Sequence, residues 1–188
     1  MWATEYSYSI APRNPDDMTN DPYVALARKS LETYITTRKV IDVPDDICPE
    51  MIERQAGAFV SLHKNDDLRG CIGTIAPTTG SVAEEIIRNA IRAAIADPRF
   101  PEVTPDELSD LTINVDVLGE IEDISSPSEL DIKRYGVIVR KGHRMGLLLP
   151  DLDGITSVSQ QIQIAKLKAG IAPSEDVELQ RFEVIRHS

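Results

Sequence analysis

Strand-like segments joined by short polar turns constrain the fold of this chain more than any other feature. Residues 58–64 and 68–75 have the composition of β-strands, and an Asn-Asp-Asp turn lies between them. Residues 135–150 repeat this arrangement around Gly142. Strand-like segments on both sides of such turns predict antiparallel β-hairpins. We therefore expect an antiparallel or mixed sheet rather than a doubly wound parallel one.

Helical periodicity occurs before, between and after the hairpins. Apolar residues recur at helical spacing over residues 22–37, behind the cap residue Asp21, and over a segment that follows Ser81 and ends near Pro98. A last helix is expected over residues 156–169. Hairpins interspersed with helices indicate an α+β fold in which helices flank the sheet.

The remaining segments complete the expected organisation. Residues 104–107 predict a short helical turn, residues 112–117 a half-buried strand, and residues 177–185 a closing strand. Residues 1–20 are polar and show no sustained period. We therefore expect a loosely held N-terminal arm followed by one domain over residues 21–188.

Composition disfavours several classes of function. The chain has 31 acidic and 20 basic residues, a formal net charge of −11, which disfavours general nucleic-acid binding. It has no apolar run of about 20 residues and no signal-peptide pattern, so we expect a cytoplasmic protein that does not enter a membrane. The three histidines and two cysteines lack metal-ligand spacing, and we predict neither a metal nor a cofactor.

One seven-residue motif points to a family. Residues Leu68–Thr74 read Leu-Arg-Gly-Cys-Ile-Gly-Thr and resemble the signature heptapeptide of the AMMECR family. The resemblance covers roughly residues 22–186. Further segments support it in chain order: Gly57–Val60, Asp97–Pro101, Tyr135–Val137, Gly146–Pro150 and Lys168–Ile171.

The region of the last helix indicates which members of this family the chain resembles. Members of eukaryotic type usually carry a tryptophan and a Thr-Cys pair there, whereas residues 160–167 of this chain are glutamine, aliphatic residues and lysine. The chain is thus similar to the prokaryotic subgroup called AmmeMemoRadiSam system protein A. The resemblance implies an α+β fold with two subdomains in one compact unit. It also implies a genomic association with a Memo-type protein and a radical SAM enzyme, but no known reaction.

The heptapeptide is the best candidate for a functional site. In a regular strand, alternation places Arg69, Cys71 and Gly73 on one face. A guanidinium beside a thiol favours the thiolate, and a glycine leaves room next to the sulfur. We therefore expect a cleft with Cys71 as the candidate catalytic residue. Its expected binding residues are Arg69, Gly70, Cys71, Gly73, Thr74 and Arg99.

Arg99 joins this set because it lies in a stiff loop. Pro98 and Pro101 restrict the backbone and project Arg99 and Phe100 from it. If the loop closes over the first hairpin, Arg99 joins Arg69 in a basic cleft. The alternative is that Phe100 fills the core and Arg99 is solvated.

The heptapeptide also fits a purely structural role. Cys71 would then be a small buried apolar residue, the glycines would let a helix pack closely on the sheet, and Arg69 would pair with a carboxylate.

Three functions remain open at this point. The first is an accessory module that binds a small anion, a peptide or a protein segment and acts with Memo-type and radical SAM proteins. The second is an enzyme that uses Cys71 as a nucleophile on an anionic small molecule or in macromolecule modification. The third is a nucleic-acid modification factor. We prefer the module because the sequence contains no complete acid/base or metal constellation.

Two further segments have features of a binding site. Residues 77–81 lead from a strand into a helix, as a phosphate cradle would, although Glu84 and Glu85 already place negative charge there. Residues 133–144 contain five Lys or Arg and no acid, whereas residues 102–131 contain ten Asp or Glu and no Lys or Arg. This basic ridge either contacts an acidic partner or pairs with the preceding acidic stretch.

Overall fold

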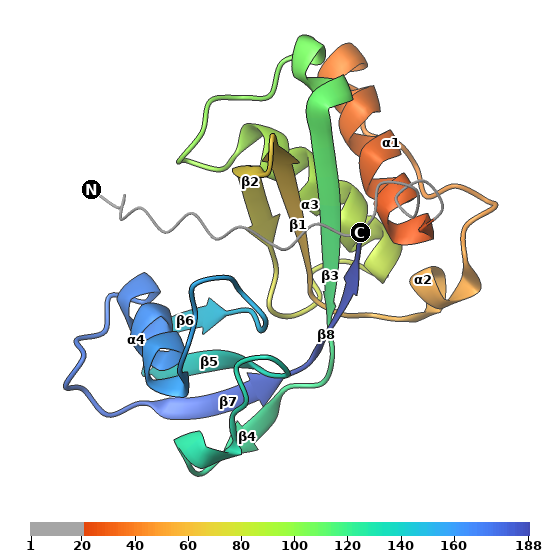
Figure 1. The fold of residues 1–188 in the computed structure, drawn as a ribbon. Helices are drawn as coiled ribbons and strands as arrows, with labels where there is room; N and C mark the ends of the chain where they lie inside the picture. The colour runs from red at the N-terminus through yellow and green to blue at the C-terminus, as the bar shows by residue number, and fades with distance from the viewer. Residues whose placement is uncertain (1–20) are drawn as a thin grey trace. The chain divides into compact units, whose positions relative to one another are not determined.

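The computed structural model describes residues 21–188, so the arm expected at residues 1–20 lies outside the described residues (Figure 1). The described chain separates into two units, one of residues 21–117 with 186–188 and one of Leu118–Ile185. Two four-stranded sheets and their flanking helices make up these units, which confirms the predicted α+β class. Within residues 21–188, no helix is long and apolar enough to cross a membrane.

The sheet of the first unit has the strand order β2-β1-β3-β8. Asn65 and Asp66 form the turn between β1 and β2 at positive φ angles of 52° and 68°, a conformation that Asn and Asp adopt more readily than most residues. β1 pairs antiparallel with both β2 and β3, so the predicted first hairpin is confirmed. The strands are β1 (Ala58–Lys64), β2 (Asp67–Gly73), β3 (Leu111–Leu118) and β8 (Val184–His187).

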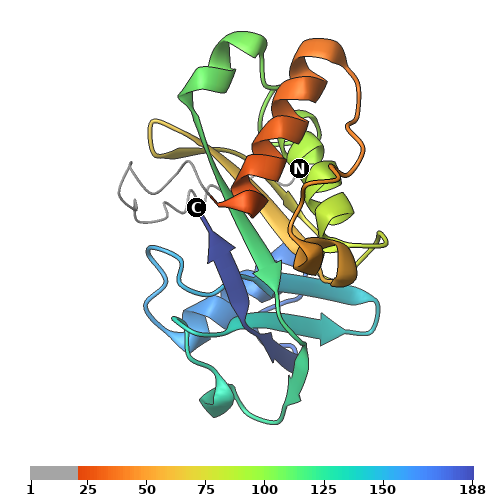
Figure 2. The ribbon, with the colours of Figure 1, turned by 90° about the vertical axis from the view of Figure 1, so that its right-hand side faces the viewer.

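Helices α1 (Pro22–Thr37) and α3 (Val82–Ile95) cover one face of this sheet (Figures 1 and 2). Each begins at the predicted cap. The Asp21 carboxylate accepts hydrogen bonds from amides in the first turn of α1, and Ser81 Oγ accepts one from the Glu84 amide of α3. The apolar stripes of both helices and the inward side chains of the strands form one core.

Two short helices belong to the same unit. The 3₁₀-helix η2 (Pro105–Asp110) extends the helical turn predicted at residues 104–107. The helix α2 (Pro49–Glu53) was not predicted, because five residues are too few to show a helical period.

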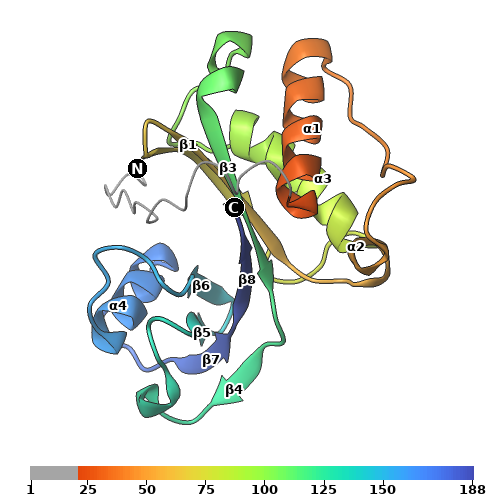
Figure 3. The same cartoon turned by 45° about the vertical axis from the view of Figure 1, so that its right-hand side comes forward.

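The sheet of the second unit has the strand order β4-β7-β5-β6 (Figure 3). Helix α4 (Val158–Lys168) packs on β5 and β6, and Gly146 makes this packing possible. A Cβ atom at Gly146 would lie only 2.1 Å from the Ala165 carbonyl oxygen. The strands are β4 (Glu122–Ile124), β5 (Gly136–Lys141), β6 (Arg144–Leu148) and β7 (Glu178–Phe182), and the unit also contains the short helix η3 (Pro127–Glu129). The predicted second hairpin is confirmed as β5 and β6.

The single closing strand expected over residues 177–185 is wrong. The structure has two strands there, β7 and β8, which are interrupted at Glu183 and belong to different sheets. The Glu183 carbonyl leaves the ladder and accepts a hydrogen bond from the Gly119 amide instead. An alternating sequence predicts extended backbone but does not show which sheet each part joins.

Candidate functional site

The face of the first sheet opposite α1 and α3 is polar. Side chains alternate along β1, so Leu62 enters the core while Ser61 and His63 lie on the opposite face. Ser61 is the cross-strand partner of Cys71 on β2 and of Asn114 on β3. We refer to this group as the polar face, and it comprises Ser61, His63, Cys71, Asn114 and Asp116.

Cys71 makes polar contacts through both its side chain and its backbone. Ser61 Oγ donates a hydrogen bond to Cys71 Sγ over 3.3 Å, and the Cys71 amide donates one to Asp97 Oδ2 over 2.9 Å. The Cys71 amide therefore points away from β1, so Ser61 and Cys71 form a non-hydrogen-bonded pair of the antiparallel ladder. Side chains of such pairs lie closer together than those of hydrogen-bonded pairs. Cys71 is partly exposed, and neither Cys71 nor Cys48 forms a disulfide.

A β-bulge breaks the alternation on which the expected Arg69–Cys71 pairing depends. Leu62 pairs with Gly70, whereas the next residue, His63, pairs with Leu68. Arg69 is therefore the extra residue of the bulge, and bulges redirect side chains.

The Arg69 guanidinium donates four hydrogen bonds to protein acceptors. It binds the Glu107 carboxylate through Nε at 3.0 Å and Nη2 at 2.9 Å, and it donates to the carbonyl oxygens of Pro101 and Glu102. The hydrogen bonds from Arg69, together with one from Lys64, lower the pKa of Glu107 from 4.5 to about 2. If the heptapeptide has a purely structural role, Arg69 is expected to pair with a carboxylate, and Glu107 is that partner.

The loop at residues 97–101 closes over the edge of β2. The buried Asp97 carboxylate accepts hydrogen bonds from the Cys71 amide and from Arg99 Nη2, the latter over 2.7 Å. Burial would raise the pKa of Asp97, but these hydrogen bonds outweigh it and lower the pKa below its usual range. Arg99 stays 43% exposed and lies over the Phe100 ring, with 5.3 Å to the ring centroid. Arg69 and Arg99 each have a carboxylate partner, so the positive charges expected to make this region basic are compensated by Glu107 and Asp97.

The glycines of the heptapeptide allow close packing on both faces of β2. A Cβ atom at Gly70 would lie 2.2 Å from the Ala93 carbonyl oxygen of α3. One at Gly73 would lie 2.1 Å from the Phe59 ring. The space beside Gly73 that was expected to admit a ligand is therefore filled by Phe59.

Thr74 belongs to a network around a buried carboxylate. Glu85 accepts hydrogen bonds from Thr74 Oγ1 at 2.6 Å, from the Thr78 amide at 2.9 Å and from Thr79 Oγ1 at 2.7 Å. Burial would raise the pKa of Glu85, but the hydrogen bonds lower it overall. The loop considered as a phosphate cradle thus encloses a carboxylate of its own chain.

His63 is the residue of the polar face that sequence reasoning missed. It is 5% exposed, and its Nε2 atom has no hydrogen-bond partner. Burial lowers the pKa of His63, and the charge of Arg186 lowers it further, while Asp66 and Asp116 oppose the shift. His63 is distant from Cys71 in sequence, and only the register of the hairpin places both on one face.

Asp116 is buried on the polar face and carries an ion pair. Its carboxylate accepts a hydrogen bond from Arg186 Nε of β8 over 2.7 Å. Burial raises the pKa of Asp116, and the Arg186 guanidinium offsets part of that effect. The half-buried strand predicted at residues 112–117 is therefore more buried at Asp116 than expected, because alternation does not reveal the covering ion pair.

The basic ridge of the second unit pairs mostly with acids that follow it in sequence. Lys141 and Arg144 both bind Glu175, at 2.9 Å and 2.8 Å. Lys133 pairs with Asp151, and Arg134 pairs with Glu183. The expected pairing with the preceding acidic stretch is thus wrong for these four residues, because the fold brings later acids beside them.

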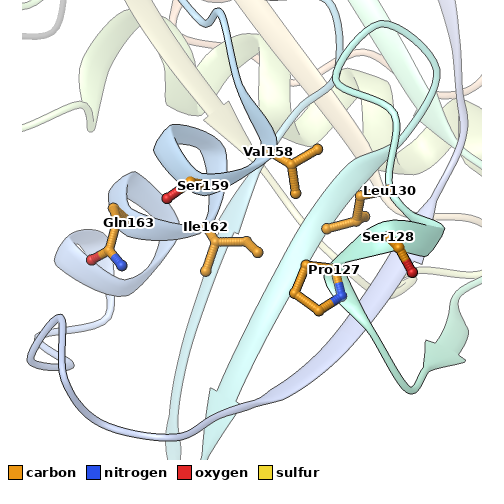
Figure 4. A pocket seen from close by; sticks show the side chains of 7 residues that line it. All are labelled: Pro127, Ser128, Leu130, Val158, Ser159, Ile162 and Gln163. Atoms are coloured by element: carbon orange, nitrogen blue, oxygen red, sulfur yellow. The ribbon is translucent and has the colours of Figure 1, made fainter.

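A separate apolar hollow lies in the second unit, between α4 and η3 (Figure 4). Figure 4 shows Ile162 and Val158 of α4 on one side and Leu130 and Pro127 on the other. Its lining contains no ionisable side chain: Pro127, Ser128, Leu130, Val158, Ser159, Ile162 and Gln163. Across residues 21–188, no group of three or more His, Cys, Asp or Glu side chains is arranged to hold a metal ion.

The fold agrees with comparisons to known proteins. The family model described as AMMECR1 matches residues 24–187. The chain belongs to the AMMECR1 family. A protein of Thermotoga maritima is 53% identical to this AMMECR1 chain over 168 residues, which cover 88% of this chain and 97% of that protein.

Two further proteins are similar to the chain over different shares of their own length. A protein of Clostridium acetobutylicum is 54% identical over 168 residues, which cover 89% of this chain but only 36% of that longer protein. The crystal structure of the uncharacterized protein PH0010 from Pyrococcus horikoshii superposes with a TM-score of 0.81 at 34% identity. That match covers 87% of this chain and 88% of the other, which confirms the fold.

Proposed function

We propose that this AMMECR1 domain is a cytoplasmic accessory module that binds a protein partner through Cys71, Arg99 and Phe100, which we refer to as the contact surface. One observation carries the proposal: the Asp97 carboxylate joins the Cys71 backbone to the Arg99 guanidinium. The contact surface is therefore assembled before any partner arrives, and preassembly reduces the entropy lost on binding.

The other candidate binding residues support this surface from beneath. Arg69 fastens the loop to β2, Gly70 brings α3 close, and Thr74 fixes the end of β2 through Glu85. Rigid support of this kind is what a precise binding surface requires. Arginine and aromatic side chains, as at Arg99 and Phe100, are also enriched among the residues that dominate binding energies.

The proposed partners are a Memo-type protein and a radical SAM enzyme. Resemblance to the AmmeMemoRadiSam subgroup motivates this choice. The Clostridium relative adds independent support, because its AMMECR1 region is one part of a longer chain. A domain that is joined to further sequence in one organism is a reasonable candidate for a separate module that associates with a partner in another.

Titration calorimetry with the Memo-type protein of the same genome tests this proposal. We expect binding in the micromolar range or tighter, weakened at least about tenfold by Arg99→Ala and by Phe100→Ala, because these are anchor-type side chains. Arg92→Ala is the matched control, since Arg92 is an exposed arginine in the last turn of α3 and is not part of the contact surface. Equal weakening by Arg92→Ala and Arg99→Ala would contradict the proposal, as would the absence of binding to both proposed partners.

A specific observation also favours the alternative, an enzyme that uses Cys71 as a nucleophile. The hydrogen bond to Asp97 is the main cause of a raised pKa of Arg99, and the electrostatic interaction between Arg99 and Cys71 adds a smaller contribution. An anionic small molecule would suit such a site. Turnover that is lost in Cys71→Ser, with the fold intact by circular dichroism, would favour this alternative over the module.

A further inference from the structure

The polar face of the first sheet is buried at its centre, although the helices of its unit lie on the other side. Helices α1 and α3 cover the opposite face, and α2 and η2 pack against these two helices (Figures 1 and 2). The second face of such a sheet is commonly solvated. Ser61 and His63 of the central strand β1 are nevertheless each only 5% exposed. Burial to this degree at the centre of a sheet face indicates a segment that covers it.

The chemistry of this face indicates what kind of side chain would cover it. His63 Nε2 has no hydrogen-bond partner among the described residues. A buried ring nitrogen without a partner is unfavourable, so a covering group that forms a hydrogen bond there is favoured. A tyrosine combines an apolar ring with a hydroxyl that both donates and accepts, so it can partner either tautomer of the imidazole.

The first described residue lies at the edge of this same sheet. Asp21 Oδ2 is 2.8 Å from His187 Nδ1 in β8, and the Tyr23 ring stacks on the His187 ring with 3.8 Å between the centroids. β8 is the edge strand next to β3, so the residues before Asp21 join the described chain at this edge. Two strand spacings separate β8 from β1, about 10 Å, whereas ten extended residues span about 33 Å. Residues 11–20 are therefore long enough to bring the residues before them over the polar face.

The sequence of residues 2–10, which lie outside the described residues, suits such a cover. Residues 1–20 as a whole show no sustained period, but this shorter stretch alternates between larger and smaller side chains. The larger side chains, at the even positions, are those of Trp2, Thr4, Tyr6, Tyr8 and Ile10. They include the single tryptophan and two of the five tyrosines of the chain. Alternation of this kind is typical of an extended segment with one largely apolar side.

We propose that residues 2–10 bind across the polar face of the same chain, with Trp2, Tyr6 and Tyr8 against the sheet. The tyrosine rings cover Ser61 and His63, and a tyrosine hydroxyl is the partner of His63 Nε2. The short connection to α1 holds the segment at a high effective concentration, so modest contacts suffice to keep it bound. This inference goes beyond partner binding and is measured on the isolated protein, so either proposal can fail without the other.

Fluorescence tests this proposal on the full chain, because Trp2 is the only tryptophan. We expect acrylamide to quench Trp2 at least about threefold less efficiently in the native protein than in the same protein unfolded in urea, since a packed indole is shielded from the quencher. Ser61→Arg places a long charged side chain at the centre of the face and should remove most of this protection. Ser109→Arg, at an exposed serine of η2, is the matched control and should leave it unchanged.

Three results would overturn the proposal. The first is equal quenching of Trp2 in the native and the unfolded protein. The second is protection that Ser61→Arg leaves intact, which would show that the segment binds elsewhere. The third is protection that is lost on dilution, which would show that the segment covers a second copy of the chain instead.

A second measurement does not depend on how the Ser61 variant folds. Diethyl pyrocarbonate modifies accessible histidines, and peptide mapping separates the buried His63 from His143, which is exposed in the turn of the second hairpin. Replacing Tyr6 and Tyr8 together by serine should raise the modification rate of His63 several-fold at pH 7 and leave that of His143 unchanged. Replacing Ser7 and Ser9 by alanine, at the odd positions of the same segment, is the matched control. An unchanged rate at His63 in the tyrosine variant would contradict the proposed cover.

Discussion

Gly70 and Arg69 make contacts that depend on the identity of each residue. Gly70 lies against a carbonyl oxygen of α3, where a side chain has no room. Arg69 uses the fork of its guanidinium to hold one carboxylate and two carbonyls. Both residues therefore stabilise the scaffold, whereas Cys71 and Arg99 are the more exposed residues of the candidate site.

Gly70→Ala should destabilise the protein by about 2 kcal/mol or more, because the new methyl group would force backbone apart rather than displace a flexible side chain. Gly80→Ala is the control, since the nearest atom there is the movable end of Glu84 at 3.0 Å. Urea unfolding at pH 7 gives both values. Equal losses in the two variants would contradict the close approach of α3 to β2.

Glu107→Gln should lower the free energy of unfolding by about 1–3 kcal/mol at pH 7, because a hydrogen-bonded ion pair with little exposure is lost. The folded pKa of about 2 lies below the ordinary 4.5, so this stability is present above pH 4.5 and disappears as the pH falls toward 2. The difference between wild type and variant should therefore shrink between pH 5 and pH 3. Glu102→Gln, at an exposed ion pair with Arg38, should change stability by less than about 0.5 kcal/mol.

The edge strand β2 is protected by the segment that follows α3. The Asp97 carboxylate accepts a hydrogen bond from the Cys71 amide, which points away from β1. Arg69 donates to the Pro101 carbonyl oxygen of the same segment. Covering an edge in this way prevents it from pairing with another chain. The loop also carries Arg99 and Phe100, so one element both protects the sheet and contributes to the proposed contact surface.

Asp97→Asn should loosen this loop without unfolding the protein. The amide oxygen of asparagine can still accept from Cys71, but the charge that holds Arg99 is gone, so we expect a loss of about 1–2 kcal/mol in local stability. Hydrogen exchange resolved to single amides should show faster exchange at Cys71 and Arg99. Asp110→Asn, at the exposed end of η2, serves as the control. Unchanged exchange at both Cys71 and Arg99 would show that the Asp97 charge does not hold the loop.

Elements with a clear period or cap were predictable from the sequence, and their long-range contacts were not. Asp21 and Ser81 correctly marked the starts of α1 and α3, and the polar turn at residues 65–67 correctly marked the first hairpin. The bulge at Arg69 escaped prediction, because one extra residue in a strand leaves no signal in a single sequence. The sequence could not show which of the 31 acidic residues pairs with Arg69, because only the tertiary fold brings Glu107 beside it.

The stability of the whole molecule should fall as the solution is made mildly acidic, partly through His63. The unfolded chain binds a proton near pH 6.5, whereas folded His63 has a lower pKa, so stability is lost as the pH falls below 6.5. The loss is at most about 1.4 kcal/mol per pH unit. His63→Gln should flatten unfolding curves between pH 7 and 5. An unchanged pH dependence in that variant would contradict a buried, neutral His63.

The family resemblance implied that the chain has two subdomains, whereas the strand and charge patterns of the sequence did not show this division. Alternation over residues 177–185 indicated one strand, yet the chain contributes β7 to one sheet and β8 to the other. The charge blocks likewise indicated a basic ridge, although Glu175 and Asp151 neutralise much of it in the folded protein. Charge patterns along a sequence describe a surface only after the fold has brought distant acids and bases together.

Hydrogen–deuterium exchange of the protein with and without the proposed Memo-type partner tests the central proposal most directly. If Cys71, Arg99 and Phe100 form the contact surface, complex formation should slow exchange at residues 70–73 and 97–101. Slowed exchange confined to α4 and η3, around the apolar hollow of the second unit, would instead show that the partner binds elsewhere.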